Sequence, residues 1–267
     1  MNVYRNPSLE LSYIDRIKQY LLGEIELPAS KLNTRPSGIH QSNLNDHSCI
    51  LKGYYSSVAS NQVEIANDSA LRFLYGRAIE RVIAFSGELD PILKDDIWVT
   101  PDDLHPVYGL TEIKSTTMSS YTDINRKNRN WVCQLRNECV AYGVNKVNLV
   151  AFFIAGSMAH WTYFGGHERP EGATYEGVAL KAWTYEFTDM ELDDHWAVIL
   201  GRRDILIEAI ESKTPVDKEI VMLELPYNWK EKREKKKVVK RWKDYWQCKK
   251  CDWSEHCTLF EELVIGV

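Results

Sequence analysis

The feature that most constrains the fold is an unbroken apolar run inside NKVNLVAFFIAGS, residues 145–157. The run has the length of a strand rather than of a helix, and Asn and Gly/Ser bound it. A strand of this kind is typical of a position buried on both faces of a sheet. Helical patterns at 125–142 and 193–212 lie on either side of it in the sequence. The sequence therefore predicts an α/β fold with a mixed β-sheet flanked by helices.

Further segments fit the same architecture. Apolar residues at 71, 74, 75, 78, 79, 82 and 83 predict a helix within 65–85, with Asn67 or Asp68 as its N-cap. Alternating patterns predict strands near 95–104, 108–116 and 175–188. We expect residues 1–38 to form an N-terminal extension with one short helix, 39–225 to form the core, and 226–267 to form a basic C-terminal segment.

The composition indicates a reducing location. The chain has 267 residues, of which 44% are hydrophobic and 27% are charged. It has no signal-peptide pattern and no apolar run of the ~18–20 residues needed to span a bilayer. We therefore expect a cytoplasmic protein without a membrane partner, in which the six cysteines are buried thiols or metal ligands rather than disulfides.

Positive charge is concentrated near the C-terminus. Residues 230–250 hold eleven Lys and Arg against three acidic residues, whereas the whole chain carries a net charge of −5. Tryptophan and tyrosine lie within this basic stretch, which suits a phosphate backbone and stacked bases. A solvated lysine-rich helix face has the same composition. The candidate DNA-binding residues are Lys235, Lys236, Lys237, Lys240, Arg241 and Trp242.

The stretch VTPDDLHPVYGLTEIKST, residues 99–116, carries the most chemistry. Glu112 and Lys114 point to one face of a strand because the side-chain period is two. We expect Asp102, at the end of the preceding strand, to be folded back beside Glu112 by the connection 105–109. Paired carboxylates suit Mg²⁺ or Mn²⁺, and a nearby lysine can orient a water molecule.

This pattern of Pro101-Asp102, Glu112 and Lys114 resembles the PD-(D/E)xK nuclease superfamily, and most closely its phage lambda-type exonuclease and RecB-like branches. The segment GRAIE, residues 76–80, is similar to the first motif of that family, in which Glu or His follows Gly by four positions. Gln134 resembles the glutamine on the helix after the lysine. The resemblance implies a restriction-endonuclease-like fold over residues 40–257.

The resemblance also implies roles for individual residues. Glu80, Asp102 and Glu112 would be metal ligands, together with the backbone carbonyl of Ile113. Lys114 would position the attacking water, and Gln134 would steady the lysine or the substrate.

Three positions depart from the family pattern or compete with it. Glu138 stands where RecB-like members often have Tyr, and Tyr142 one turn later is interpreted as a packed helix aromatic. Glu80 stands where many RecB-like members have His. Asp90 competes with Asp102, which we prefer because it follows Pro and has the shorter spacing to Glu112.

The remaining question concerns the cysteines. Cys133 and Cys139 are interpreted as buried apolar residues. A zinc site could use Cys248, Cys251, Cys257 and His256, with His47 also available, although adjacent residues rarely bind one tetrahedral ion. Alternatively, Cys49 is the fourth thiolate. That arrangement, one cysteine before the nuclease motifs and three after them, resembles the iron–sulfur staple of RecB-like nucleases, including CRISPR-associated exonucleases.

The resemblance thus implies a 4Fe-4S cluster on Cys49, Cys248, Cys251 and Cys257, which would pack the C-terminal segment back on the core. The expected function is a Mg²⁺- or Mn²⁺-dependent DNA exonuclease in phage or mobile-element recombination, repair or replication. Alternatives are a CRISPR-associated spacer-processing nuclease and a non-catalytic DNA-binding protein with a zinc-stabilised tail. Expected partners are single-stranded DNA or duplex ends, with a second copy or an integrase as further candidates.

Overall fold

The structure is a computed structural model. It describes residues 1–26, 36–45, 49–58, 67–86, 89–116, 129–154, 177–217, 220, 229–234, 237–242, 251 and 257. The chain divides into two compact units, the first formed by Met1–Gln41 and Ala70–Ala197 and the second by Ser42–Ser69 and Val198–Val267. None of the helices among the described residues is both long enough and apolar enough to cross a membrane.

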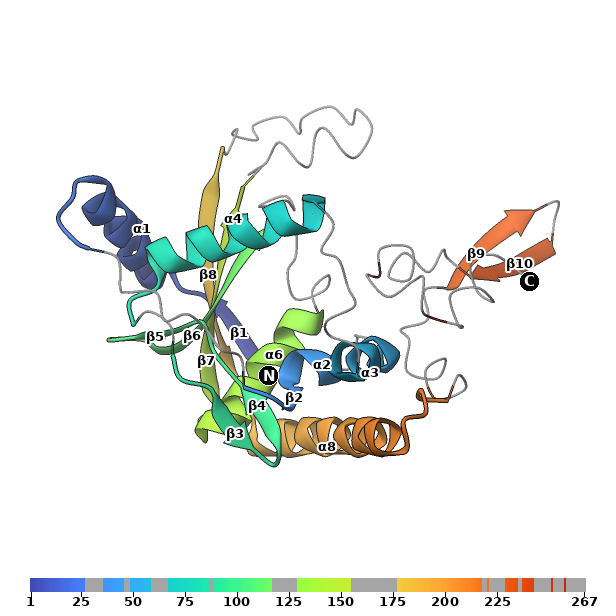
Figure 1. Ribbon diagram of the computed structural model, residues 1–267. Helices are drawn as coiled ribbons and strands as arrows, with labels where there is room; N and C mark the ends of the chain where they lie inside the picture. Colours follow the sequence, from blue (N-terminus) through green and yellow to red (C-terminus); the bar gives the residue numbers. More distant parts are fainter. Residues whose placement is uncertain are drawn as a thin grey trace. The chain divides into compact units, whose positions relative to one another are not determined.

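A five-stranded mixed sheet forms the centre of the first unit (Figure 1). Its strand order is β1-β8-β7-β6-β5, and β6 and β7 run parallel whereas the other neighbours are antiparallel. The strands are β1 (Asn2–Arg5), β5 (Asp103–His105), β6 (Gly109–Thr116), β7 (Lys146–Phe153) and β8 (Ala179–Glu186). Helix α6 (Arg129–Tyr142) makes the crossover between the parallel strands β6 and β7.

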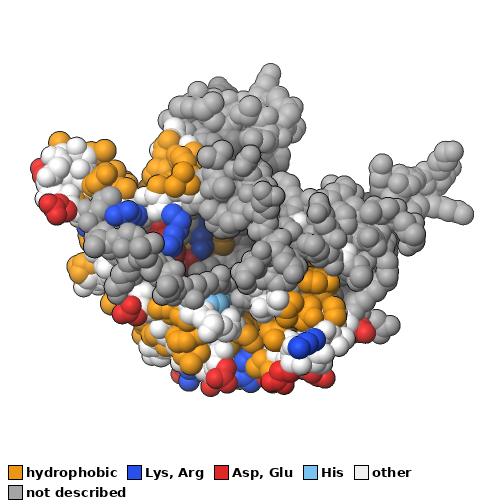
Figure 2. Space-filling view, viewed as in Figure 1, with side chains coloured by type: hydrophobic (Ala, Val, Ile, Leu, Met, Phe, Trp, Pro, Cys, Tyr) orange, Lys and Arg blue, Asp and Glu red, His pale blue; other side chains and the backbone are white. Residues whose placement is uncertain are grey.

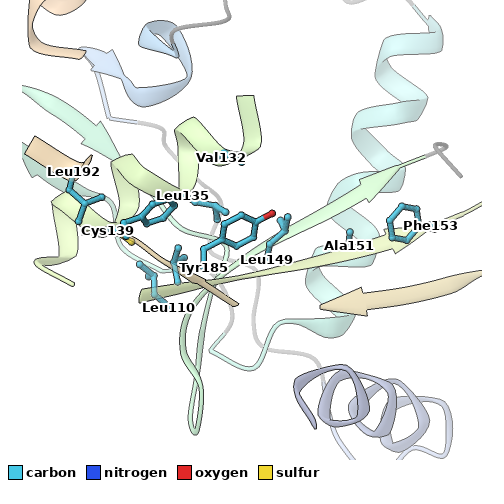
Figure 3. Close-up of a cluster of buried hydrophobic side chains, with 11 residues drawn as sticks. Leu110, Val132, Leu135, Cys139, Leu149, Ala151, Phe153, Tyr185 and Leu192 are labelled. Atoms are coloured by element: carbon cyan, nitrogen blue, oxygen red, sulfur yellow. The ribbon is translucent and has the colours of Figure 1, made fainter. Parts of the chain in front are cut away.

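Side chains pack on both faces of this sheet. On one face, Leu149 and Phe153 of β7 pack with Leu135 and Cys139 of α6 in a buried cluster (Figure 3). On the other face, Val150 packs with residues of α1 (Pro7–Leu21) and α4 (Asn67–Ile83). Strand β7 is therefore buried from both sides, as its apolar run predicts, and the expected α/β fold with a mixed sheet flanked by helices is confirmed.

The first residues of the chain are integrated into this sheet. Strand β1 pairs with β8, with Asn2 opposite Glu186. The side chain of Asn6 caps α1 by accepting a hydrogen bond from the Leu9 amide at 3.1 Å, and it also donates one to Thr184 at 2.9 Å. Leu9 and Tyr13 of α1 are fully buried.

A second, smaller sheet has the order β2-β4-β3, formed by β2 (Ile39–His40), β3 (Ile92–Lys94) and β4 (Ile97–Val99). The expected strand near 95–104 is thus two strands, β4 and β5, in different sheets. Asp102 directly precedes β5 instead of ending the earlier strand, because Pro101 interrupts the pairing between them.

The second unit contains α2 (Gln41–Leu44, which begins in the first unit), α3 (Ile50–Val58) and the C-terminal part of α8 (Asp189–Ser212). The Arg202 side chain is buried, and its Nε donates to the Leu44 carbonyl at 2.9 Å. A Cβ on Gly53 would lie 3.1 Å from the Asn43 carbonyl oxygen, so α3 packs closely there. Strands β9 (Trp229–Glu234) and β10 (Lys237–Trp242) pair antiparallel.

Candidate active site

The β5–β6 hairpin brings Asp102 next to Glu112. Asp103 pairs with Thr111 and His105 with Gly109, so the same register places Asp102 across from Glu112. The Ile113 amide donates to Asp102 Oδ2 at 2.8 Å. His105 stabilises the connection, because its Nδ1 accepts hydrogen bonds from the amides of Val107 and Tyr108. The expected return of Asp102 toward Glu112 is therefore seen in the structure.

Glu112 lies at the centre of the site and is fully buried. Its Oε1 accepts hydrogen bonds from Lys114 Nζ and from Gln134 Nε2, the latter at 2.5 Å. Lys114 forms an ion pair with Glu112, and its side chain remains 22% exposed. Strand β6 thus exposes part of the charged Lys114 side chain at the surface, while Gln134 of helix α6 contributes the side-chain amide that holds the Glu112 carboxylate.

Helix α6 adds an acidic residue that the sequence interpretation treated only as a departure from a family pattern. Glu138 follows Gln134 by four positions, so the two side chains lie on one face of the helix. Glu138 is fully buried, and its charge interacts with Asp102 and Lys114. The four-residue spacing of Gln134 and Glu138 was the signal in the sequence that could have identified it.

The crowding of carboxylates changes their acidity. Burial raises the pKa of Glu112 well above its ordinary value, and the charges of Asp102 and Glu138 raise it further. Burial likewise raises the pKa of Glu138, to about 8, even though a hydrogen bond with Glu112 acts in the opposite direction. For Lys114, burial lowers the pKa, but the charges of Glu112 and Asp102 outweigh it and raise the pKa above its ordinary value.

Several carboxylate oxygens in this site have no hydrogen-bond donor. They are Oε2 of Glu112 and both oxygens of Glu138. The two groups can join through a hydrogen bond only when one of them is protonated. Buried oxygens without donors and surplus negative charge fit a hard divalent cation such as Mg²⁺ or Mn²⁺.

The cation-binding geometry is not preformed. Across the described ranges, no group of three or more His, Cys, Asp or Glu side chains is arranged as a ready metal site. Lys114 and Gln134 both bind Glu112 Oε1. A cation shared by Asp102 and Glu112 would therefore require these side chains to adjust.

Glu80 lies on α4, where its carboxylate is 4.0 Å from Arg77. Helix α4 approaches β6 next to the lysine, because a Cβ on Gly76 would lie 3.5 Å from Ser115 Oγ. That distance is an ordinary contact, so an alanine would fit at position 76. Figure 2 shows Lys and Arg side chains beside this helix, with acidic side chains at a deeper level. Asp90, the alternative to Asp102, interacts electrostatically with Tyr142. Burial raises the pKa of Tyr142, and the charges of Glu138 and Asp90 raise it further.

The cysteines fall into two groups. Cys133 and Cys139 are buried in the first unit, which confirms that they are core residues. In the second unit, Cys49, Cys251 and Cys257 lie close enough for their charges to interact, although about 200 residues of sequence separate Cys49 from the other two. Burial raises the pKa of the Cys49 thiol, and the two other cysteines add to the rise. Cys248, His47 and His256 lie outside the described residues.

The candidate DNA-binding residues are only partly covered. Lys237, Lys240, Arg241 and Trp242 belong to strand β10, so a strand stands where a lysine-rich helix was one interpretation. Lys235 and Lys236 lie outside the described residues.

Comparisons with known proteins found solved structures of low similarity. No family model matches the sequence, and no curated protein matches it. Among solved structures, the crystal structure of SSO0001 is 13% identical and has a TM-score of 0.42, with 94% of this chain and 96% of that chain covered. An alkaline exonuclease (LHK-Exo) from Laribacter hongkongensis is 14% identical and has a TM-score of 0.41, with 67% of this chain and 92% of that chain covered. The site is therefore interpreted from its own geometry.

Proposed function

We propose that this protein is a DNA nuclease that requires Mg²⁺ or Mn²⁺ and degrades DNA from its ends. The observation that carries the proposal is the convergence of Asp102, Glu112 and Lys114 on one hairpin, with carboxylate oxygens left without donors. A binding module has no need of buried acids near a phosphate backbone, because they repel it. Hydrolysis of a phosphodiester uses this combination of groups.

The residues take distinct roles in the proposed reaction. Asp102, Glu112, Glu80 and the Ile113 carbonyl hold the cation, and Gln134 fixes Glu112 from α6. Lys114 orients the attacking water in line with the scissile bond and stabilises negative charge on the phosphate. The bound cation supplies charge neutralisation at the phosphate and the leaving oxygen.

We further propose that strand β10 and the two lysines before it contact the DNA backbone and bases. The residues are Lys235 and Lys236 before the strand and Lys237, Lys240, Arg241 and Trp242 within it. Each lost phosphate contact should reduce the dependence of DNA affinity on salt by about one unit of slope. Replacement of Lys237 and Lys240 by Gln should therefore weaken binding to all DNA sequences alike.

We also propose a 4Fe-4S cluster on Cys49, Cys248, Cys251 and Cys257, with zinc as the alternative metal. The proximity of three of these thiols is the supporting observation. Anaerobically purified protein should be brown with broad absorbance at about 400 nm, and Cys49→Ser should remove both. Colourless protein with stoichiometric zinc would instead establish the zinc site.

The central test is a cleavage assay on end-labelled single-stranded and duplex DNA with Mg²⁺ and with Mn²⁺. The wild-type protein should release nucleotides from ends, and Lys114→Ala should be slower by about 100-fold or more. Lys18→Ala is the matched control, because Lys18 is 63% exposed and pairs with Asp15 of the same helix. DNA binding without cleavage by the wild-type protein would refute the nuclease and favour a non-catalytic DNA-binding protein.

The biological setting that we favour is recombination, repair or replication of phage or mobile-element DNA. Spacer processing beside a CRISPR integrase is the competing setting. A pull-down against an integrase separates the two, because only the second requires a stable complex.

A further inference from the structure

We propose that Glu138 is an additional ligand in the divalent-cation site, supplied by helix α6 from the side opposite the β5–β6 hairpin. The inference rests on the proposed function and extends its ligand set beyond the carboxylates of the strands and of α4. Glu138 stands at a position where the resembling family often has Tyr, so the family pattern does not imply this role.

The first argument is placement. Gln134 reaches Glu112 with its Nε2 2.5 Å from Oε1. Glu138 follows one turn later on the same face of α6 and so faces the same carboxylate. Leu135 and Cys139, its apolar neighbours on the helix, are fully buried in the core beneath. The packing of α6 on the sheet therefore directs Glu138 into the acidic site.

The second argument is the state of its oxygens. Glu138 is fully buried, and neither carboxylate oxygen has a hydrogen-bond donor. Buried carboxylates are ordinarily satisfied by several donors, because a buried charge without partners is costly. Glu112 has the same deficit at Oε2. Two adjacent carboxylates with three oxygens that lack hydrogen-bond donors are suited to bind a cation, whereas without one they repel each other and do not stabilise the fold.

The third argument is that the polar groups near Glu138 are already bonded to Glu112. Lys114, whose charge acts on Glu138, is hydrogen-bonded to Glu112. The Gln134 amide lies close enough to lower the pKa of Glu138, but its Nε2 donates to Glu112 Oε1 at 2.5 Å. The requirement for a positive partner is met when a divalent cation bridges Glu112 and Glu138.

The test is calorimetric titration of Mn²⁺ into metal-free protein without DNA. Glu138→Gln keeps the shape and removes the charge, and Glu138→Met keeps the length without any polar atom. Both should bind Mn²⁺ about tenfold or more weakly than the wild-type protein. Asp194→Asn, which removes an exposed carboxylate from α8, should bind as the wild-type protein does.

Thermal unfolding of the same metal-free proteins is the second measurement. Neither Glu138 variant should melt below the wild-type protein, because the substitutions remove an unpaired buried acid. Wild-type affinity in both variants would overturn the inference and leave the proposed function intact. Collapse of the melting temperature in both variants would also overturn it, by identifying Glu138 as structural. A wild-type protein that binds no Mn²⁺ would overturn the inference together with the proposed function on which it rests.

Discussion

Asp102 and Asp103 are neighbours in sequence, yet they serve two buried polar clusters of opposite character. Asp103 faces α1 and accepts four hydrogen bonds, from the Tyr13 hydroxyl at 2.6 Å, the Phe85 amide at 3.0 Å, and the Ser86 amide and hydroxyl at 2.8 and 2.6 Å. Asp102 turns to the other face, where Oε2 of Glu112 and both carboxylate oxygens of Glu138 lack donors. The first cluster is complete as it stands, whereas the second requires a cation. Satisfied acids hold this fold together, and unsatisfied acids are available for chemistry.

The contrast between the two clusters would fail most clearly if Glu112 were needed for stability rather than for cleavage. We expect Glu112→Gln to lower the rate of DNA cleavage by about 1,000-fold, because a ligand carboxylate in the site is lost. The metal-free variant should unfold at nearly the same urea concentration as the wild-type protein, because Gln keeps an acceptor oxygen for Lys114 and Gln134 while the repulsion with Asp102 and Glu138 is removed. Cleavage kinetics and urea unfolding of the same preparations provide the test. A large loss of stability with cleavage retained would reverse the roles of the two clusters.

The complementary substitution is Asp103→Ala. It should lower the free energy of unfolding by about 3–4 kcal/mol, because the Tyr13 hydroxyl and the donors of Phe85 and Ser86 are left buried without an acceptor. Urea unfolding measures this loss directly.

Asp102→Asn is the matched control for that variant, since it alters the adjacent residue on the other face of the hairpin. It should abolish cleavage while changing the unfolding free energy by less than about 1.5 kcal/mol. Equal destabilisation by both variants would contradict the separation of the two clusters.

The remaining prediction concerns the pH dependence of stability. In the folded metal-free protein the pKa of Glu138 is raised to about 8 from an ordinary value of 4.5. Between these two values the folded state holds more protons than the unfolded state, so a rise in pH lowers the free energy of unfolding. The contribution of Glu138 to stability is greatest below about pH 4.5 and decreases as the pH rises toward 8, by at most about 1.4 kcal/mol per pH unit.

Urea unfolding in the presence of a chelator, repeated from pH 5 to pH 8.5, measures this slope. Glu138→Gln should make the slope shallower, with the remainder due to Glu112, whose pKa is also raised, and Asp194→Asn should leave it unchanged. A wild-type slope that persists in Glu138→Gln would assign the pH dependence to another group.

Much of the second cluster, around Glu112, could be predicted from the sequence. Strand periodicity places Glu112 and Lys114 together, and a short connection returns Asp102 beside them. The helix α6 and the central strand β7 were likewise predictable from their apolar patterns. The burial of Glu138 was not predicted, since it depends on how α6 rotates against the sheet. Four donors from two distant segments, Tyr13 and Phe85-Ser86, meet at Asp103, and no local pattern indicates such a contact.

Edge strands were the least predictable elements. Strand β1 has three exposed residues of four, so it lacks the alternation that identifies a half-buried strand. Strand β9 reads WKEKRE and has no apolar alternation either. Pairing with a distant partner, rather than local pattern, determines both.

The pairing of β1 with β8 has a consequence for biosynthesis. During synthesis β1 leaves the ribosome before β8, which lies some 180 residues further along the chain, as the pairing of Asn2 with Glu186 shows. Until then β7 can pair with β6 while the far edge of the sheet stays open. Strand β1, which is synthesised before β8, therefore pairs with the edge that β8 leaves open, and it shields the backbone of β8 from pairing with other chains. Loss of the first five residues should leave an active site that forms but a protein that aggregates.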